Sequence, residues 1–338
     1  MLIIGIDTSC DDTSAAVLRD GSQVLSNVIH SQVKLHQPHG GVVPELASRE
    51  HIKNIVHVVQ EALRISQADM EKISAIAVTI GPGLIGSLLV GLYYAKGLSY
   101  GLGIPLIAVN HLEGHILSIF LEETRPDFPF VILTVAGGHT NIYHVQGFGQ
   151  YEQMGQTLDD AAGEAFDKVA KILGLGYPGG PVIERAAKGG DKERIKFPRA
   201  YMSKDSLDFS FSGLKTAVAL YVKEWEKARK EDVTLEDISA AFQESVVDVL
   251  VDKLILAAQK RGVEHVALAG GVACNTRLRE RLQEAAEAQG LKAYWPRPAY
   301  CTDNGAMIAL AGYHRFLKGE VANLSIDVKS RFPIGQAP

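Results

Sequence analysis

The chain has 338 residues, of which 46% are hydrophobic and 22% are charged, and its formal net charge is −5. This length predicts two domains of ordinary globular composition. The negative charge argues against a protein that coats nucleic acid through bulk charge, although a local basic surface stays open, and three cysteines at long spacings make a disulfide framework unfavourable.

The chain opens on a predicted β-meander with strands at Leu2–Asp7, Ser14–Arg19 and Ser22–Ser31. The turn after the first strand, DTSCDDT, consists of small and polar residues, so its backbone N–H groups can approach a phosphate closely. The carboxylates of this turn, Asp7, Asp11 and Asp12, could hold a cation or orient a nucleophile. An ordinary polar turn is the alternative.

A helix with one apolar stripe is predicted over Ser48–Ser66. The stripe consists of residues at helical spacing, namely Ile52, Ile55, Val56, Val59 and Leu63. Such a stripe usually faces the core of its own domain. It could also extend to the helix of a partner protein.

The uncharged stretch Ile73–Ala95 is long enough to span a bilayer, which takes about 20 residues. Gly81-Pro82-Gly83 breaks it, however, into a predicted strand at Ala75–Ile80 and a helix that begins near Leu84. The N-terminus has no basic region and no cleavage signature. We therefore expect a cytoplasmic protein with no membrane association.

The motif HLEGH places His111 and His115 four residues apart on one face of a predicted helix, a spacing that suits a shared metal ion. Two core or surface histidines are the alternative. In the zinc-protease motif H-E-x-x-H the glutamate follows the first histidine, whereas here Leu112 stands there and Glu113 is rotated off that face. Asp303, before the last predicted helix, is a plausible third ligand if that helix returns to the first lobe.

The segment Val131–Val145, VILTVAGGHTNIYHV, repeats the strand–turn–strand pattern of the N-terminus. Two such turns suggest two related lobes that grip one phosphate-bearing ligand, although flexible hairpins would give the same pattern. We predict an α/β protein of the actin-like ATPase (ASKHA) fold, with a ligand cleft between two related lobes. The expected first lobe is 1–125, with 310–338 returning to pack on it, and the second is 126–309.

Three positions in the second lobe could bind a nucleotide. Asn275 follows the glycines of AGGVACN, where a base or ribose could lie against the backbone. Asp167 could accept bonds from ribose hydroxyls, and Gly180 permits close approach. For Lys168 we favour a solvated charge on a helix.

Two common nucleotide-binding motifs are absent from the sequence. The chain has neither G-x-x-x-x-G-K-[ST] nor a well-placed G-x-G-x-x-G. The main sequence evidence for a P-loop ATPase or a Rossmann dehydrogenase is therefore missing.

A basic cluster could contact phosphates, although such clusters are usually solvated faces. Its members are Lys188, Lys192, Arg194, Lys196 and Arg199.

Nine motifs in the same order along nearly the whole chain resemble the bacterial TsaD branch of the universal tRNA threonylcarbamoyladenosine synthase family, once described as sialoglycoprotein endopeptidases. They are IDTSCDDT, GGVVPELASREH, GPGLIGSLLVG, NHLEGH, AGGHT, GEAFDKVAKILGLGYPGGP, FSFSGLKTA, AGGVACN and CTDNGAMIA. The resemblance implies the actin-like ATPase fold. It also implies transfer of a threonylcarbamoyl group from threonylcarbamoyl-AMP to the exocyclic amine of the adenosine after the anticodon, in tRNAs that read codons beginning with A, with release of AMP.

The resemblance also implies site residues and partners. The family's metal ligands, for iron or zinc, fall on His111, His115 and Asp303. Its contacts to the nucleotide ligand, ATP or threonylcarbamoyl-AMP, fall on Thr134, Val135, Ala136, Gly137, Gly138, Asp167, Gly180 and Asn275. Glu184 stands where some members have aspartate. The implied partners are tRNA, the paralogous subunit TsaB and the ATPase TsaE. We add the hypothesis that Asp11 or Asp12 positions the attacking amine or accepts its proton.

Three other functions are alternatives. A small-molecule kinase of the same fold would share the phosphate-binding turns but would not need HLEGH. A zinc protease is disfavoured by the position of Glu113. A non-catalytic scaffold would be expected to lose the set His111, His115 and Asp303.

Overall fold

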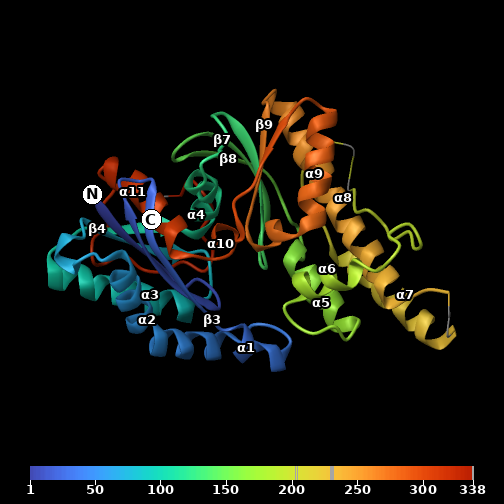
Figure 1. The fold of residues 1–338 in the computed structure, drawn as a ribbon, viewed down its shortest axis with the longest axis horizontal. Coiled ribbons are helices and arrows are strands. Elements are labelled where there is room, and N and C mark those ends of the chain that lie inside the picture. The colour runs from blue at the N-terminus through green and yellow to red at the C-terminus, as the bar shows by residue number, and fades with distance from the viewer. Residues whose placement is uncertain (202, 204, 229–231, 337–338) are drawn as a thin grey trace. The chain divides into compact units, whose positions relative to one another are not determined.

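The computed structural model describes residues 1–201, 203, 205–228 and 232–336. By their internal contacts these residues form two compact units. Unit 1 comprises Met1–Arg125, Phe148–Gln150 and Pro296–Pro338, and unit 2 comprises Pro126–Gly147 and Tyr151–Trp295. Figure 1 shows the elements of both units along the chain.

The sheet of unit 1 has the strand order β3-β2-β1-β4-β5. Its strands are β1 (Leu2–Asp7), β2 (Asp12–Arg19), β3 (Gln23–Ser31), β4 (Ala75–Gly81) and β5 (Leu106–Asn110). β1 pairs antiparallel with β2 and parallel with β4, and β4 pairs parallel with β5. The turn between β2 and β3 has Asp20 and Gly21 both at positive φ, as the sequence Asp-Gly predicts for a tight hairpin.

Helices cover both faces of this sheet because the side chains of β1 alternate between them. Ile4 and Ile6 belong to the core formed with α2 (Pro44–Ser66) and α3 (Ile85–Leu102). Figure 1 shows these two helices on one side of the sheet. Gly5 faces the opposite side, where α11 (Gly305–Leu317) packs on β1, β2 and β4. The shorter helical elements of unit 1 are α1 (Val33–His36), η1 (Gln37–His39), η2 (Met70–Lys72), α4 (His111–Leu117), η3 (Ser118–Leu121) and α10 (Pro298–Cys301).

The sheet of unit 2 has the strand order β10-β9-β6-β7-β8. Its strands are β6 (Phe130–Val135), β7 (Thr140–Gly147), β8 (Gln150–Gln156), β9 (His265–Ala269) and β10 (Lys292–Tyr294). β6 pairs antiparallel with β7 and parallel with β9, as β1 pairs with β2 and β4 in unit 1. The same pairing around the first strand of each unit confirms the prediction of two related α/β lobes.

The helical elements of unit 2 are α5 (Ala162–Ile172), α6 (Gly179–Ala187), α7 (Ser212–Ala228), α8 (Leu235–Arg261), η4 (Gly271–Cys274) and α9 (Thr276–Ala288). α8 begins with a capping box, in which Thr234 and Asp237 bond each other's backbone N–H groups. Its 27 residues are largely buried, which makes α8 the central helix of this unit.

The stretch Ile73–Ala95 contains β4 and the start of α3, as expected, and no helix of the described chain is long and apolar enough to cross a membrane. The helix of the HLEGH motif ends as an α-helix at Leu117, and the turn that follows is the 3-10 helix η3. The Ser118 hydroxyl bonds the His115 carbonyl there, in competition with an α-helical bond.

Candidate metal centre and substrate site

The predicted metal ligands of HLEGH follow the carboxyl end of β5, and the side chain of Asn110 fixes where α4 begins. Its Oδ1 accepts the backbone N–H of Leu112 at 2.9 Å, and its Nδ2 donates to the carbonyl of Phe332 at 2.7 Å. The helix is buried along its whole length. His111 and His115 are therefore held on a short, rigid element at the end of a parallel strand, the edge at which α/β sheets bind ligands.

The structure brings His111, His115 and Asp303 together in unit 1. The two Nε2 atoms lie 3.1 Å apart, and Asp303 Oδ1 lies 3.1 Å from Nε2 of His115 and 3.4 Å from Nε2 of His111. Ligand atoms about 2.0–2.1 Å from a tetrahedral zinc ion are about 3.3 Å from one another. The three donor atoms thus have the spacing that a metal ion requires.

Asp303 reaches this position through glycine contacts. A Cβ on Gly305 would lie 2.5 Å from the backbone N of Ala16, so the start of α11 rests directly on β2. Asn304 caps α11 through the N–H of Met307 and donates to the carbonyl of Thr302 at 2.8 Å, which fixes the turn around Asp303. A Cβ on Gly114 would lie 2.9 Å from Ile308, so α4 also approaches α11 closely.

The charges of the cluster favour a cation. Burial alone would lower the pKa of His111, but the carboxylates of Asp303 and Asp7 outweigh it and raise the pKa to about 10. Burial likewise would raise the pKa of Asp303, but His111 and His115 hold it well below its ordinary value. The carboxylates that attract a proton here would equally attract a metal ion.

Glu113, the acid within the motif, belongs to a different contact. Its Oε2 accepts from Nε of Arg315 at 2.7 Å, and Arg315 also pairs with Glu320 at 2.7 Å. In the described chain these residues line a cavity of about 700 Å³ whose lining includes neither histidine of the motif. Glu113 is thus an anchor between α4 and α11 rather than the base of a zinc protease.

The acidic turn after β1 holds two half-buried carboxyl groups. Burial and the charge of Asp303 raise the pKa of Asp12 to about 7, and the same causes raise the pKa of Asp11. The turn is tied to α2 by His51, which is fully buried. Its Nε2 donates to the carbonyl of Cys10 at 3.0 Å, so its Nδ1 accepts from the hydroxyl of Thr13 at 2.7 Å.

The second predicted turn, in unit 2, joins β6 to β7 and touches the start of α5. Ala136 N–H donates to His139 at 2.8 Å, and Glu164 N–H donates to the carbonyl of Gly137 at 3.0 Å. A Cβ on Gly163 would lie 2.6 Å from the carbonyl of Ala136. Thr134 and Val135 are buried in β6, whereas Gly137 and Gly138 are exposed, so the two glycines are the accessible part of this turn.

Asp167 and Asn275, predicted as nucleotide contacts, have structural partners in unit 2. Asp167 Oδ1 accepts the N–H of Gly179 at 2.6 Å and so joins α5 to α6. Asn275 caps α9 through Leu278 N–H at 3.0 Å, while its Nδ2 donates to Gln243 of α8 at 2.7 Å. Gly180 faces open space, since a Cβ there would meet nothing within 4 Å.

Glu184 of α6 accepts the N–H of Thr276, at the start of α9, at 2.9 Å. This bond joins α6 to the turn that contains Asn275. A cavity of about 210 Å³ lies beside it, lined by Glu184, Gln243, Thr276 and Arg277 among others. The positions predicted from AGGHT, GEAFD, YPGGP and AGGVACN are thus connected through α5, α6 and α9.

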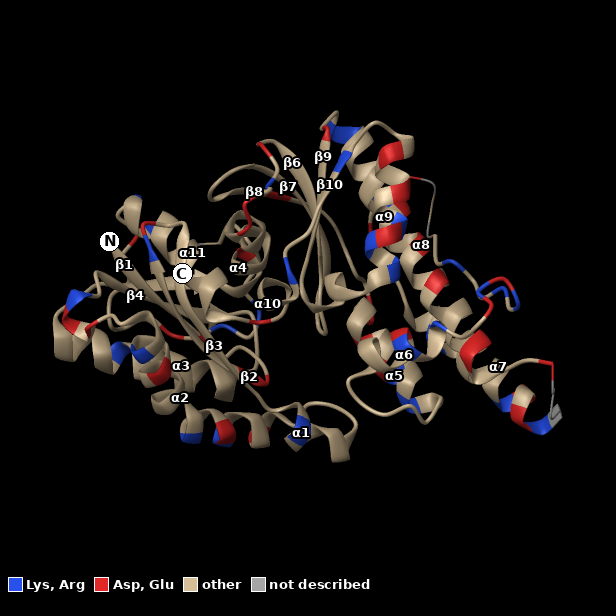
Figure 2. Ribbon diagram, in the orientation of Figure 1, with Lys and Arg blue, Asp and Glu red and all other residues tan. Residues whose placement is uncertain are grey.

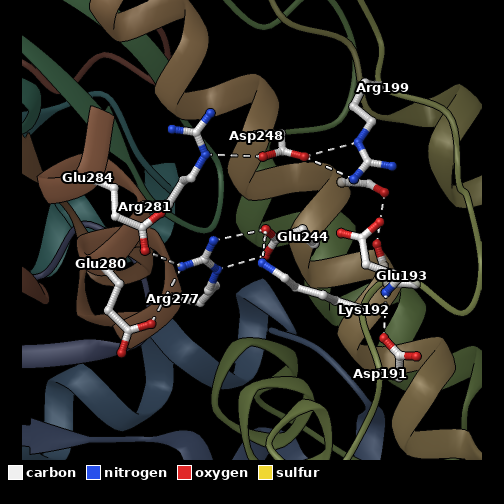
Figure 3. A network of polar contacts seen from close by, with 12 residues as sticks. Asp191, Lys192, Glu193, Arg199, Glu244, Asp248, Arg277, Glu280, Arg281 and Glu284 are labelled. Carbon is white, nitrogen blue, oxygen red and sulfur yellow. Dashed lines mark hydrogen bonds and ion pairs between the residues drawn. The ribbon is translucent and has the colours of Figure 1, made fainter. Parts of the chain in front are cut away.

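Two members of the predicted basic cluster pair with acids of α8. Lys192 pairs with Glu244 at 2.8 Å, and Arg199 pairs with Asp248 at 2.9 Å. Figure 3 shows Arg277 and Arg281 of α9 bound to the same two carboxylates, and Figure 2 shows acids and bases interleaved along α9. Lys168, favoured as a solvated charge, pairs with Asp160 at 2.7 Å. These cations therefore stabilise unit 2 more than they offer charge to a polyanion.

Sequence reasoning missed Arg315 beside Glu113 and Gln243 beside Asn275. It included Asp7 in the acidic turn but did not predict its contact with His111. Asp7 ends the first strand, at the sheet edge where ligands gather, so its position was a usable signal. Arg315 and Gln243 are separated from their partners by 202 and 32 residues and belong to no motif.

The fold defines the class of protein. It is similar to full-length HypF in its phosphate- and nucleotide-bound form, with a TM-score of 0.60 and 16% identity over 94% of this chain and 55% of that one. Component A of the Acidaminococcus fermentans (R)-2-hydroxyglutaryl-CoA dehydratase gives a TM-score of 0.54 and 17% identity over 93% of this chain and 98% of that one. The chain is an α/β protein of the actin-like ATPase (ASKHA) fold.

The family model described as TsaD, tRNA N6-adenosine threonylcarbamoyltransferase, matches residues 23–310. Proteins of that name from Thermodesulfovibrio yellowstonii and Syntrophus aciditrophicus are each 52% identical to the chain. The first match covers 99% of this chain and 100% of the relative, and the second covers 100% and 99%. The chain belongs to the TsaD family and is a tRNA-modifying transferase.

Proposed function

We propose that this enzyme transfers the threonylcarbamoyl group of threonylcarbamoyl-AMP to the exocyclic amine of the adenosine after the anticodon, in tRNAs that read codons beginning with A. The amine nitrogen forms a bond to the carbamoyl carbon, the bond from that carbon to the phosphate oxygen breaks, and AMP leaves. The observation that supports the proposal most is the convergence of His111, His115 and Asp303, within a family whose members are named for this activity.

These three residues would hold one divalent metal ion, iron or zinc, because two imidazole nitrogens and one carboxylate oxygen suit both. When bound, the ion supplies Lewis-acid polarisation of phosphate or carbonyl oxygens. The protein holds the donor atoms 3.1–3.4 Å apart, two of them on α4 and the third on the turn before α11. Such rigid placement avoids reorganisation during the reaction.

Asp12 is our preferred base for the attacking amine, with Asp11 in a positioning role. A base works best when its pKa is near the working pH, and burial raises the pKa of Asp12 to about 7. Its Oδ1 has no hydrogen-bond partner among the described residues. This buried oxygen therefore has a free acceptor site, which we assign to the proton of the attacking amine.

We expect a pH dependence that Asp12→Asn removes. In the wild-type protein the single-turnover rate should rise with pH and level off near or below pH 7, because only the ionised carboxylate accepts a proton and a bound cation favours that form. Asp12→Asn should lower the plateau by about 100-fold or more and give a flat profile.

Thermal unfolding provides the folding control for Asp12→Asn. A carboxyl whose pKa is raised by folding destabilises the protein as the pH rises from about 4 through 7. The metal-free variant should therefore be at least as stable as wild type at pH 8. A rate profile that keeps its slope in the variant would assign the proton to another group.

Unit 2 would bind the nucleotide end of the donor. Gly137 and Gly138 would offer backbone N–H groups to phosphate, and Gly180 would give the ribose room. Thr134, Val135 and Ala136 would shape the turn through their backbone. Asp167 and Asn275 would contact the nucleoside while keeping their bonds to Gly179 and Gln243.

The partners we propose are TsaB and TsaE, with TsaB bound on α2 and α3. The apolar residues of α2 lie partly in the core and partly at the surface. Ile55 and Val59 are buried, whereas Ile52 is 63% exposed and Val56 is 41% exposed. On α3, Tyr93 is 62% exposed. Apolar side chains on two packed helices suit an α-helical partner surface.

Ile52→Asp should weaken binding of the TsaB paralogue by about tenfold or more, since it removes buried apolar area and places a charge in the interface. Isothermal titration with the purified paralogue measures this. Ile65→Asp is the matched control, because Ile65 is also exposed on α2 but lies off the stripe. Equal losses in the two variants would contradict the proposed surface.

Partner subunits would also complete the tRNA-binding surface, because Lys192 and Arg199 of the basic cluster are already paired with acids. We further propose that the protein acts in the cytoplasm.

Nucleoside mass spectrometry tests the function. Unmodified tRNA is incubated with this protein, its proposed partners, ATP and preformed threonylcarbamoyl-AMP. A threonylcarbamoyl mass gain on adenosine that requires this protein supports the proposal. ATP consumption with phosphorylation of a small molecule and no gain on tRNA would indicate the kinase instead.

A further inference from the structure

We infer that Asp7 is a positioning residue for the metal ligand His111: its carboxylate accepts the Nδ1–H of the imidazole and thereby directs Nε2 toward the metal. The inference rests on the metal ion proposed above. In this inference Asp7 is not itself a metal ligand; it contacts the imidazole of a ligand.

The geometry begins with the order of the strands. β1 ends at Asp7, β5 ends just before His111, and β4 runs between them in the sheet and ends at Gly81. Because all three strands are parallel, their carboxyl ends meet at one edge. Asp7 and His111 therefore stand on either side of the end of β4, with a short space between their side chains.

Two polar atoms face each other across this space. His111 Nδ1 lies 3.5 Å from Asp7 Oδ1, and neither atom has another hydrogen-bond partner in the described chain. Asp7 is fully buried and His111 is 6% exposed. A buried polar atom without a hydrogen bond costs free energy. A hydrogen bond between His111 Nδ1 and Asp7 Oδ1 offsets this cost for both atoms.

The chemistry of a metal-bound imidazole decides the direction of the bond. Nε2 of His111 points at the donor atoms of His115 and Asp303. A neutral imidazole that binds a metal through Nε2 carries its proton on Nδ1. That proton can be donated only to an acceptor, and the acceptor at hand is Oδ1 of Asp7. Carboxylates in this position fix the ring and raise its basicity.

The other carboxylate oxygen is anchored separately. Ser9 Oγ donates to Oδ2 of Asp7 at 3.1 Å, and Ser9 itself is held by Leu84, whose N–H donates to its carbonyl at 2.9 Å. His115 differs from His111 here, because its Nδ1 has no partner in the described residues. The two histidines of the motif therefore have unequal support, and His111 is the ligand that Asp7 controls.

The test is zinc affinity, measured on metal-free protein with a competing chelator. Asp7→Asn keeps the size of the side chain and should weaken Zn²⁺ binding by about 10- to 100-fold. Ser9→Ala, which removes the other bond of Asp7, should stay within about threefold of wild type. Asp12→Asn removes one negative charge from the same turn without touching the Asp7–His111 contact, so it measures the general effect of charge.

The results test the role of Asp7 and the existence of the metal centre separately. A loss in Asp7→Asn well beyond that in Asp12→Asn supports the inference, whereas equal losses or an unchanged affinity overturn it. Failure of the wild-type protein to bind Zn²⁺ would instead overturn the proposed metal centre itself. If Asp7→Asn does not fold, ¹⁵N-histidine NMR of the zinc-loaded wild type decides: a protected Nδ1–H on His111 supports the contact, and Nδ1 bound to the metal refutes it.

Discussion

His111→Ala is expected to abolish stable metal binding and to lower the single-turnover transfer rate by about 1,000-fold. The substitution removes one of three donor atoms that lie 3.1–3.4 Å apart, and it leaves Asp303 and His115 with an incomplete ligand set. Loss of Lewis-acid stabilisation of several kcal/mol corresponds to a rate loss of this size. Metal content by mass spectrometry and transfer to tRNA are measured on the same preparation.

The control for this prediction is another histidine. His57 of α2 is exposed, and His57→Ala should leave the metal content of the isolated protein unchanged. Asp303→Ala should behave like His111→Ala, because the two residues act as one ligand set. Full metal content in both His111→Ala and Asp303→Ala would mean that the metal is held elsewhere.

Gly305→Ala is expected to lower the free energy of unfolding by about 3 kcal/mol or more. A Cβ at this position would lie 2.5 Å from the backbone N of Ala16 and 2.6 Å from the carbonyl carbon of Ala15. Backbone atoms in a central strand cannot move aside as a flexible side chain can. The start of α11 must therefore shift, and Asp303, two residues earlier, should shift with it, so zinc affinity should fall as well.

Urea unfolding of the metal-free protein measures the change. Gly97→Ala is the matched control, since Gly97 lies in the middle of α3 with nothing within 4 Å of a Cβ. There alanine should stabilise the helix by about 0.5–1 kcal/mol. If Gly305→Ala were as stable as wild type and bound zinc normally, close packing of α11 would not be what places Asp303.

Most of the fold was predictable from local patterns. In residues 1–31 the apolar runs and the turn residues between them predict the strands of the first hairpins. Gly81-Pro82-Gly83 predicts the boundary between β4 and α3. The repeat around Phe130 gave the second lobe, because the same hairpin geometry needs the same turn residues. β8 and β10 have no comparable signal: β10 has only three residues, and β8 is mostly exposed.

The metal cluster was only partly predictable. The i, i+4 spacing of His111 and His115 follows from helix geometry alone. The approach of Asp303, 188 residues after His115, depends on tertiary packing through Gly5 and Gly305. The sequence offered Asp303 as a ligand only on the condition that the last helix returns to the first lobe, and the family resemblance implied the same residue. The contact between Asp7 and His111 likewise depends on strand order, which no local pattern determines.

The second site shows why polar residues are hard to assign from a motif. Asn275 was predicted to bond a ligand, yet its side chain already caps α9 and holds Gln243. The basic residues before α7 were weighed as a phosphate surface, but acids on α8 bind Lys192 and Arg199. A sequence shows which groups can form such bonds, and packing decides which partners they find.

The most direct test of the metal-centred mechanism is transfer at controlled metal occupancy. The protein is stripped with a chelator and reloaded with increasing amounts of iron or zinc, and threonylcarbamoyl transfer to tRNA is measured in a single turnover from preformed threonylcarbamoyl-AMP. We expect the amount of rapidly formed product to rise in proportion to metal bound, up to one ion per chain, and to stay near zero in His111→Ala. Full transfer by the stripped protein would contradict the proposed role of His111, His115 and Asp303.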